Sequence, residues 1–487
     1  MLSGFVSRSL TAAILVLSLA RLALVSAEQI RIPHDLAYES PIQRSVDIAR
    51  AGENLYDPAV YDDGPFVLTM YTPLYFWLAS VLPTHPSNPF LASRILAAAA
   101  MLLSACTLLL VVPRRKMTYV AGMAVGAFFL PAMVVFNATL ARNDSLGLLL
   151  SALAVVLVAR TGASARALPV VAALCCLAFW TKQTQLAASA ACLLYVGGRS
   201  VRRATGFAAL LALLFGASAL LAHLCLGEGL WFSTLVAPRN PFGTHQWLRV
   251  WRSLTGESAF LGTLAVIVWL AWRAWRRRDR GVLTRSPFPL YVIATSPSFL
   301  LVGKLGAGTN YVFEFYLASL MWIVHELSAI PMRRRAAAGM LLLVLLTTTR
   351  EVGLRRIQDY SLAPWANSAP IRTLRATLAK DMASISPRPT RALNLMNAAW
   401  TYDIGATACN DPYLYSLLWT SGTLDPRSIT TALELGSFEA VVVPSTALAT
   451  PHGAESAGLL DVMRVAAEHY PRRLVRPQYQ VWLRAQP

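Results

Sequence analysis

Long apolar runs fill most of the first 350 residues and constrain the fold more than any other feature of this sequence. Hydrophobic residues make up 56% of the 487 residues, and charged residues only 14%. A water-soluble protein of this length cannot bury so much apolar surface, so the composition indicates a bilayer as solvent. We therefore predict a mostly α-helical, polytopic transmembrane bundle of about 11 spans. The runs lie at about 10–27, 91–112, 118–136, 145–159, 167–181, 184–198, 205–226, 259–272, 287–302, 311–330 and 336–349.

Three of these runs allow a second interpretation. The pair that flanks Lys182 is shorter than the ~20 residues that cross a ~30 Å hydrocarbon core, so a broken or re-entrant element is the alternative to two full spans. The first run ends in Val25-Ser26-Ala27, which resembles a signal-peptidase site. We favour an uncleaved span because so many further spans follow, and a cleaved signal peptide is the alternative.

The charge pattern predicts an orientation. Lys and Arg number 43 against 25 Asp and Glu, and the cations cluster between apolar runs, which is typical of cytoplasmic loops and not of a nucleic-acid-binding surface. Threading the spans from a cytoplasmic N-terminus brings every such cluster to the inner side. The clusters are Arg114-Arg115-Lys116, Arg160 with Arg166, Arg199/Arg202/Arg203, Arg273/Arg276/Arg277/Arg278/Arg280 and Arg333-Arg334-Arg335.

Two large segments then face the non-cytoplasmic side of what we expect to be a bacterial inner or plasma membrane. They are a long first loop at 28–90, within a transmembrane domain at 1–350, and a C-terminal region at 351–487. The latter lacks long apolar runs and contains strand-like pieces at 439–443 and 480–483 among helix-like stretches. We predict a small α/β domain there.

Acidic side chains in the first outer loop are candidates for catalysis. Asp35 and Glu39 are four residues apart and would share one face of a helix. A carboxylate beside a membrane cleft can act as a general base toward a hydroxyl group. The alternative is that each is a solvated loop acid.

Cationic groups occur in three other loops on the same predicted face. Three cations around one cavity would suit a phosphate or pyrophosphate, above all one carried by a lipid whose tail lies between spans. The alternative is that cations at span ends only extend to the headgroups. The Gly-rich turn at 303–311 resembles a phosphate cradle but lacks P-loop spacing. The candidates are Arg142 with Asp144, Lys182 with Gln183, and Lys304, followed by Asn310, Tyr311 and Glu314.

The order of these acidic and cationic candidates along the chain, and their common position on the predicted non-cytoplasmic side, resemble the GT-C class of polytopic glycosyltransferases. This class includes the protein O-mannosyltransferases, the lipid A aminoarabinose transferases and bacterial mannosyltransferase-like proteins. The resemblance covers roughly residues 10–330. It also rests on 52–56 (Gly-Glu-Asn-Leu-Tyr), on Tyr71-Thr72-Pro73-Leu74-Tyr75 and on the following Arg94. By this resemblance, Tyr71 and Arg94 are further candidates for substrate binding.

The resemblance implies transfer of a sugar from a polyprenyl-phosphate donor to a glycan, lipid or protein acceptor. Asp35 or Glu39 would be the catalytic base, and we favour Asp35. Many members carry adjacent or once-spaced acids, whereas these two are four apart. The cations would bind the departing phosphate. Asp144 and Glu314 would orient neighbouring cations or, alternatively, pair with them to lower the cost of burial. No cofactor is required and membrane lipid is an expected partner; some members use a divalent metal, although the sequence shows no clear ligand cluster.

Two other functions compete with this one. A secondary transporter would explain the interrupted pair near Lys182, but it predicts inverted repeats and little mass outside the membrane. We find no internal repeat, and the outer segments are long. The second is a protein that binds a lipid-linked glycan without chemistry, and it would be indifferent to loss of Asp35.

Overall fold

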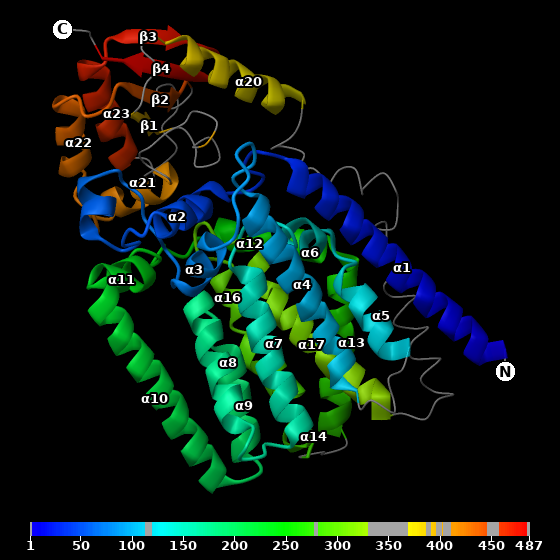
Figure 1. Cartoon of the computed structure of the whole chain (residues 1–487). Helices are drawn as coiled ribbons and strands as arrows, with labels where there is room; N and C mark the ends of the chain where they lie inside the picture. Colours follow the sequence, from blue (N-terminus) through cyan, green and yellow to red (C-terminus); the bar gives the residue numbers. More distant parts are fainter. Residues whose placement is uncertain are drawn as a thin grey trace. The chain divides into compact units, whose positions relative to one another are not determined.

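The computed structural model describes residues 2–112, 119–276, 281–329, 369–385, 391–395, 402, 411–445 and 457–484 (Figure 1). The chain divides into two compact units, each built from separate stretches of sequence. We call the first the helical unit; it comprises Met1–Ile30, Arg94–Leu220 and Pro241–Ser361. The second, called the mixed unit, comprises Arg31–Ser93, Leu221–Asn240 and Leu362–Pro487. The predicted domain boundary between residues 350 and 351 lies outside the described residues.

The helices of the helical unit follow the apolar runs, with two corrections. The run at 118–136 is two helices because Pro131 begins the second one, and the run at 287–302 is broken in the same way at Pro297. Proline has no N–H to continue a helix. The run at 336–349 lies outside the described residues. The elements are α1 (Leu2–Arg31), α4 (Leu91–Val111), α5 (Tyr119–Phe128), α6 (Ala132–Asn137), α7 (Asp144–Thr161), α8 (Leu168–Thr181), α9 (Ala187–Gly197), α10 (Val201–Leu226), α12 (Thr244–Thr255), α13 (Ser258–Arg276), α14 (Val282–Arg285), α15 (Phe288–Thr295), α16 (Ser298–Leu301), the short η4 (Thr309–Val312) and α17 (Phe313–Ala329).

Several helices have the length and composition of membrane spans. Within the described residues, α4, α7 and α10 qualify individually, and α12 with α13 qualifies as a pair bent by 91°. The apolar side chains of α10 are largely exposed, with Leu213 at 65% and Leu220 at 60%, as expected for a helix in contact with lipid. The protein is therefore an integral membrane protein. The expected total of about 11 spans stays a prediction.

The core of the helical unit is formed by α7, α9, α15 and α17. Helix α7 packs against α8 and α9, α15 packs against both α9 and α17, and α13 packs against α17 (Figure 1). The ring of Tyr316 stacks on Phe128 with centroids 5.9 Å apart, and its hydroxyl donates to the Ala127 carbonyl at 2.7 Å. The buried hydroxyl thus has the partner that burial demands.

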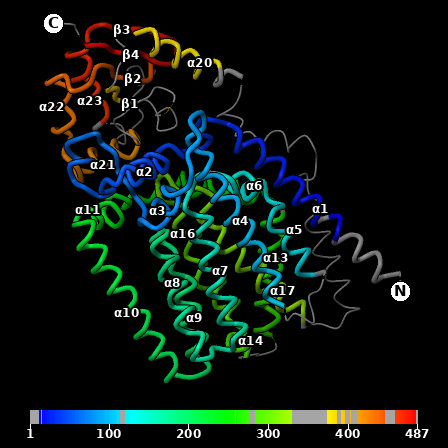
Figure 2. Tube along the Cα trace, viewed as in Figure 1, coloured from blue at the N-terminus to red at the C-terminus, as the bar shows by residue number. Residues whose placement is uncertain are grey.

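The mixed unit joins three distant stretches of chain in one core. The Tyr61 ring stacks on Phe232 with centroids 5.0 Å apart, and the Tyr415 hydroxyl donates to the Tyr61 carbonyl at 2.9 Å. Figure 2 shows the early blue trace beside the orange trace of α21. The elements are α2 (Ser40–Arg50), η1 (Ala59–Asp63), α3 (Leu74–Ser80), α11 (Gly229–Trp231), η3 (Phe232–Val236), α20 (Ala369–Ser384), β1 (Ala392–Asn394), α21 (Pro412–Thr420), α22 (Arg427–Glu434), β2 (Ala440–Pro444), α23 (Ala457–His469), β3 (Arg472–Val475) and β4 (Tyr479–Leu483).

A four-stranded mixed sheet in the order β1-β2-β4-β3 forms the centre of the C-terminal part. Strand β1 runs parallel to β2, and the β3–β4 hairpin completes an antiparallel edge. Side chains alternate between faces: Val441 and Val443 pack with α21, α22 and α23, while Ala440 and Val442 pack with α20. Strands β2 and β4 confirm the strand-like pieces expected at 439–443 and 480–483.

Asp381 fastens α20 to the β3–β4 hairpin. Its buried carboxylate accepts two hydrogen bonds from Arg476, at 2.8 and 2.7 Å, and one from the Tyr479 hydroxyl at 2.6 Å. The bonds from Arg476 hold the pKa of Asp381 below its usual range. We expect Asp381→Ala to cost about 3 kcal/mol because it leaves the buried Tyr479 hydroxyl unpaired. Thermal unfolding in detergent should show the loss. The exposed Asp461→Ala should change nothing, and an equal loss there would contradict this role for Asp381.

Candidate functional site

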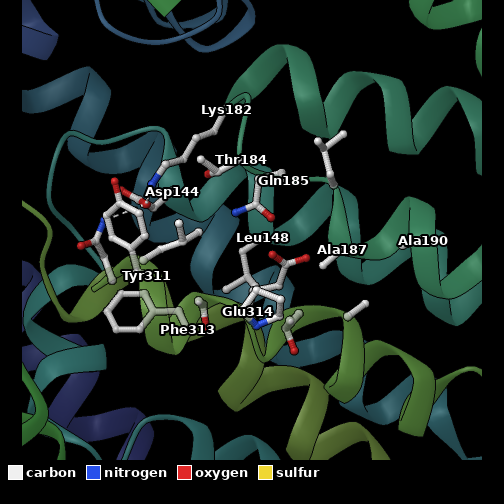
Figure 3. Close-up of a pocket in the computed structure, with 17 residues that line it drawn as sticks. Asp144, Leu148, Lys182, Thr184, Gln185, Ala187, Ala190, Tyr311, Phe313 and Glu314 are labelled. Carbon is white, nitrogen blue, oxygen red and sulfur yellow. Dashed lines mark hydrogen bonds and ion pairs between the residues drawn. The ribbon is translucent and has the colours of Figure 1, made fainter. Parts of the chain in front are cut away.

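The helical unit contains a cavity of about 240 Å³ with a polar end and an apolar end (Figure 3). Lys182 and Asp144 point toward each other at one end with Tyr311 beside them, while Ala187 and Ala190 lie at the other. The lining comes from α7, the break between α8 and α9, α9 itself, α15, α16, η4 and α17. Its residues are Asp144, Leu148, Lys182, Thr184, Gln185, Leu186, Ala187, Ala190, Ala294, Thr295, Pro297, Ser298, Leu301, Asn310, Tyr311, Phe313 and Glu314.

The polar end is organised around Lys182. Helix α8 stops at Thr181 and the chain is extended at Lys182, which directs a side chain only 2% exposed into the unit. Its Nζ lies 2.5 Å from Asp144 Oδ1 and 4.8 Å from the centre of the Tyr311 ring. Asn310 Nδ2 donates to the same carboxylate oxygen at 2.9 Å. The break between α8 and α9 at Lys182 brings four of the candidate residues together.

The buried ion pair between Lys182 and Asp144 restricts which ligands the cavity can bind. An ammonium and a carboxylate removed from water are stable only while each keeps a partner of opposite charge. An anionic ligand group can reach Lys182 by replacing Asp144 as its partner. Asn310 would still donate to the released carboxylate. The charge of Arg142, which also acts on Asp144, would then balance the carboxylate in place of Lys182.

Farther along the cavity the polar groups become fewer. Glu314 accepts a hydrogen bond from the Tyr291 hydroxyl at 2.8 Å, and Gln185 accepts one from Ser151 at 3.1 Å. Beyond them the wall is formed by small and aliphatic side chains of α9, α15 and α16. Glu314 was a sequence candidate, whereas Gln185 and Tyr291 were not predicted. An extended apolar ligand with one anionic end would match this gradient.

Two other predicted cations lie outside the lining. Arg142 is two residues before Asp144, and its charge acts on that carboxylate. Lys304 is half-buried, and burial together with the charge of Lys182 lowers its pKa. The turn that carries it is held by backbone bonds: Gly243 N–H to the Gly303 carbonyl at 2.8 Å, and Leu305 N–H to that of Pro241 at 3.0 Å. Arg142 and Lys304 therefore interact electrostatically with residues of the polar end without lining the cavity.

Two further candidates have other surroundings. Gln183 follows Lys182 but does not line the cavity, whereas the next residue, Thr184, does. Arg94 is fully buried, and its Nη1 donates to the Gln29 carbonyl at 2.8 Å. This bond fastens α4 to the end of α1. The ligand-binding roles predicted for Gln183 and Arg94 stay predictions.

The acidic pair of the first loop belongs to the mixed unit. Asp35 and Glu39 do not share a helix, which corrects that expectation, because α2 begins only at Ser40 with Pro41 in its first turn. Asp35 instead accepts from the Ser40 N–H at 2.6 Å, and Glu39 accepts from the Leu36 N–H at 3.0 Å. Both carboxylates are buried. Burial, then the charge of Glu39, raises the pKa of Asp35.

Two residues far along the chain accompany this pair and were not predicted. Buried Arg375 of α20 donates from Nη2 to the Asp35 carbonyl at 3.1 Å. Asp411 caps α21 by accepting from the Leu414 N–H at 3.1 Å, and burial raises its pKa to about 6, with a further contribution from the charge of Asp35. Asp35 Oδ1 is buried without a hydrogen-bond partner among the described residues. Such a carboxyl oxygen is suited to accept a proton.

Tyr71 and the residues around it form a helix start. Tyr71 is half-buried, and its carbonyl accepts from the Tyr56 hydroxyl at 2.6 Å. Pro73 directly precedes α3, a position at which proline is well tolerated. Gly229 packs so closely on Tyr56 that a Cβ there would lie 1.8 Å from the Tyr56 carbonyl oxygen. Only glycine fits at that position.

A metal site is not apparent in the described part of the chain. Among those residues, no group of three or more His, Cys, Asp or Glu side chains could hold an ion. The expectation that the reaction needs no cofactor stays a prediction.

Comparison with known proteins shows the fold. No family model matches the chain, and no curated protein matches it in sequence. ArnT from Cupriavidus metallidurans bound to undecaprenyl phosphate matches with a TM-score of 0.61 at 14% identity, covering 96% of this chain and 97% of that one. Its apo state matches with a TM-score of 0.60, also at 14% identity, covering 89% and 93%. The Archaeoglobus fulgidus oligosaccharyltransferase tethered to an acceptor peptide matches with a TM-score of 0.50 at 12% identity, covering 98% and 74%.

These likenesses confirm the resemblance predicted from the sequence at the level of the fold. ArnT, an aminoarabinose transferase, and the archaeal enzyme are both GT-C glycosyltransferases. The chain therefore has a GT-C fold.

Proposed function

We propose that this protein is a membrane glycosyltransferase that moves a sugar from a polyprenyl-phosphate donor to an acceptor hydroxyl on the non-cytoplasmic side. The observation that carries the proposal is the cavity whose buried Lys182 lies at one end and whose apolar wall lies at the other. A lipid phosphate has the same two parts. The GT-C fold and the undecaprenyl phosphate bound to ArnT support the donor class.

The proposed reaction is a single displacement at the anomeric carbon. A bond forms between the acceptor oxygen and this carbon while the bond from the carbon to the phosphate oxygen breaks. The acceptor proton passes to the Asp35 carboxylate, and polyprenyl phosphate leaves with the bonding electron pair. Lys182 would stabilise the charge that develops on the phosphate, with Arg142 and Lys304 adding to the field.

Asp35 is preferred to Glu39 as the base. Of the two acids, Asp35 has a carboxyl oxygen, Oδ1, that is buried without a hydrogen-bond partner among the described residues. Its raised pKa also makes it a stronger base than an ordinary aspartate once it is ionised. Glu39, whose carboxylate accepts from the Leu36 N–H, would then hold the loop in shape.

Arg375 is expected to position Asp35 through its bond to the Asp35 carbonyl. Arg375→Gln should lower kcat about tenfold while leaving the KM for the donor unchanged, because the base is displaced but the phosphate site is not. Steady-state kinetics in detergent would measure both. The control is Arg427→Gln, whose side chain is 88% exposed. A raised donor KM with a normal kcat would contradict the positioning role.

One observation favours a secondary transporter instead. The interruption between α8 and α9 at a buried lysine is typical of discontinuous transporter helices. Incubation with polyprenyl-phosphate sugars separates the two functions, since a transferase or hydrolase consumes donor and a transporter moves its substrate unchanged. A protein that only binds lipid-linked glycans would leave the donor intact and would not need Asp35.

A further inference from the structure

The last turns of α13 expose three tryptophans on the surface of the helical unit. Trp269, Trp272 and Trp275 are 47%, 49% and 74% exposed, while Ile267 and Leu270 are buried. The helix therefore packs one face against its own unit and turns an aromatic face outward. Tryptophan is typical of the boundary between hydrocarbon and headgroups, because its ring is apolar and its N–H is polar.

Two arginines are stacked on this aromatic face. The Arg273 guanidinium lies 5.5 Å from the centre of the Trp269 ring, and that of Arg276 lies 5.1 Å from the Trp272 ring. Each pair has the four-residue spacing of helix neighbours. Stacking uses the flat face of a guanidinium and leaves its edge of N–H groups to bind oxygen atoms. The two arginines are thus held in a geometry suited to phosphate.

The charge at this end of α13 is positive. The sequence continues with Arg277, Arg278 and Arg280 against the single acid Asp279. Lys and Arg side chains near a membrane surface attract anionic lipids electrostatically. Zwitterionic headgroups carry no net charge, so the arginines do not attract them in this way.

We propose that Trp269, Trp272, Arg273, Trp275 and Arg276, here called the Trp–Arg face, form a binding site for an anionic phospholipid. Arg273 and Arg276 bind its phosphate, and the tryptophans contact the glycerol and the upper acyl chains. The site is separate from the cavity at Lys182, whose lining shares no residue with it. It does not depend on the proposed glycosyl transfer.

Native mass spectrometry of the full-length protein, released from nanodiscs that contain equal phosphatidylglycerol and phosphatidylethanolamine, tests this site. We expect retention of phosphatidylglycerol over phosphatidylethanolamine. The double variant Arg273→Gln/Arg276→Gln should lower the retention of phosphatidylglycerol about tenfold. The control is Arg427→Gln/Arg464→Gln, which removes equal charge from exposed side chains of the mixed unit and should retain phosphatidylglycerol normally.

Three results would overturn the proposal: equal retention of both lipids by the wild type, unchanged retention in the arginine variant, or an equal loss in the control. If the arginine variant does not purify in folded form, the variant Trp269→Leu/Trp272→Leu tests the proposal instead. This variant keeps both charges but removes the stacking that orients them. It should also lose phosphatidylglycerol, and normal retention would overturn the proposal.

Discussion

Asp35→Asn is expected to lower kcat roughly 10²- to 10⁴-fold, the usual contribution of a general base, without loss of folded protein. In the wild type the Asp35 carboxylate accepts a hydrogen bond from the Ser40 N–H at 2.6 Å, and the side-chain oxygen of asparagine can still accept this bond. What the variant loses is the ability to take a proton from the acceptor. Donor consumption with and without acceptor, measured on purified protein, would report the loss. Binding of the donor should stay as in the wild type.

The matched control is Asp461→Asn, an isosteric change at an exposed position of α23. It should react at the normal rate. A normal rate for Asp35→Asn would exclude Asp35 as the base and would direct attention to Glu39.

The pH dependence of the wild type provides a further check on Asp35. A base works only when ionised, so kcat/KM should fall as pH falls through its pKa. Because burial and the Glu39 charge raise the pKa of Asp35, this fall should occur at higher pH than for an ordinary aspartate. Glu39 and Asp411 are the neighbouring acids, and Arg375 is the neighbouring cation. An acidic limb at or below the ordinary aspartate range would contradict the assignment.

Lys182→Met is expected to weaken binding of polyprenyl phosphate by roughly 10²-fold, because a buried charged hydrogen bond to the phosphate is lost. The single variant also leaves Asp144 buried without its ion-pair partner, which lies 2.5 Å away in the wild type. That defect alone costs about 3 kcal/mol or more of stability. The double variant Lys182→Met/Asp144→Asn removes both charges and avoids it.

The double variant separates the two roles that Lys182 could have. If Lys182 binds phosphate, the double variant folds normally and still binds donor weakly. If Lys182 only neutralises Asp144, the double variant binds donor as the wild type does, and the phosphate site proposed here is wrong. The control Lys380→Met removes an exposed lysine of α20 and should change neither property. Affinity can be measured by native mass spectrometry with undecaprenyl phosphate.

The apolar runs predicted most of the helical unit. Burial in a bilayer requires long apolar helices, so α4, α7 and α10 could be located from composition alone. The breaks at Pro131 and Pro297 follow from the chemistry of proline, but the apolar runs at 118–136 and 287–302 continue across each proline and so do not reveal them. The 4-residue spacing of Asp35 and Glu39 does not place them on one helix, because α2 begins at Ser40, after both of them.

The candidate residues were easier to predict than their partners. Lys182 and Asn310 were singled out as polar groups at span ends, but their meeting at Asp144 joins positions 38 and 166 residues apart. Arg375 and Asp35 are 340 residues apart. No local pattern encodes such pairs. The same holds for the mixed unit, whose core combines three stretches that a single sequence gives no reason to join.

The central claim is that the chain transfers sugar from a lipid phosphate. The most direct measurement is incubation of the purified membrane protein with a panel of polyprenyl-phosphate sugars, followed by mass spectrometry of the lipid fraction. We expect one of these donors to be converted to free polyprenyl phosphate when acceptor is present, and Asp35→Asn to slow this conversion roughly 10²- to 10⁴-fold. Quantitative recovery of every donor, from protein shown to bind polyprenyl phosphate through Lys182, would contradict it.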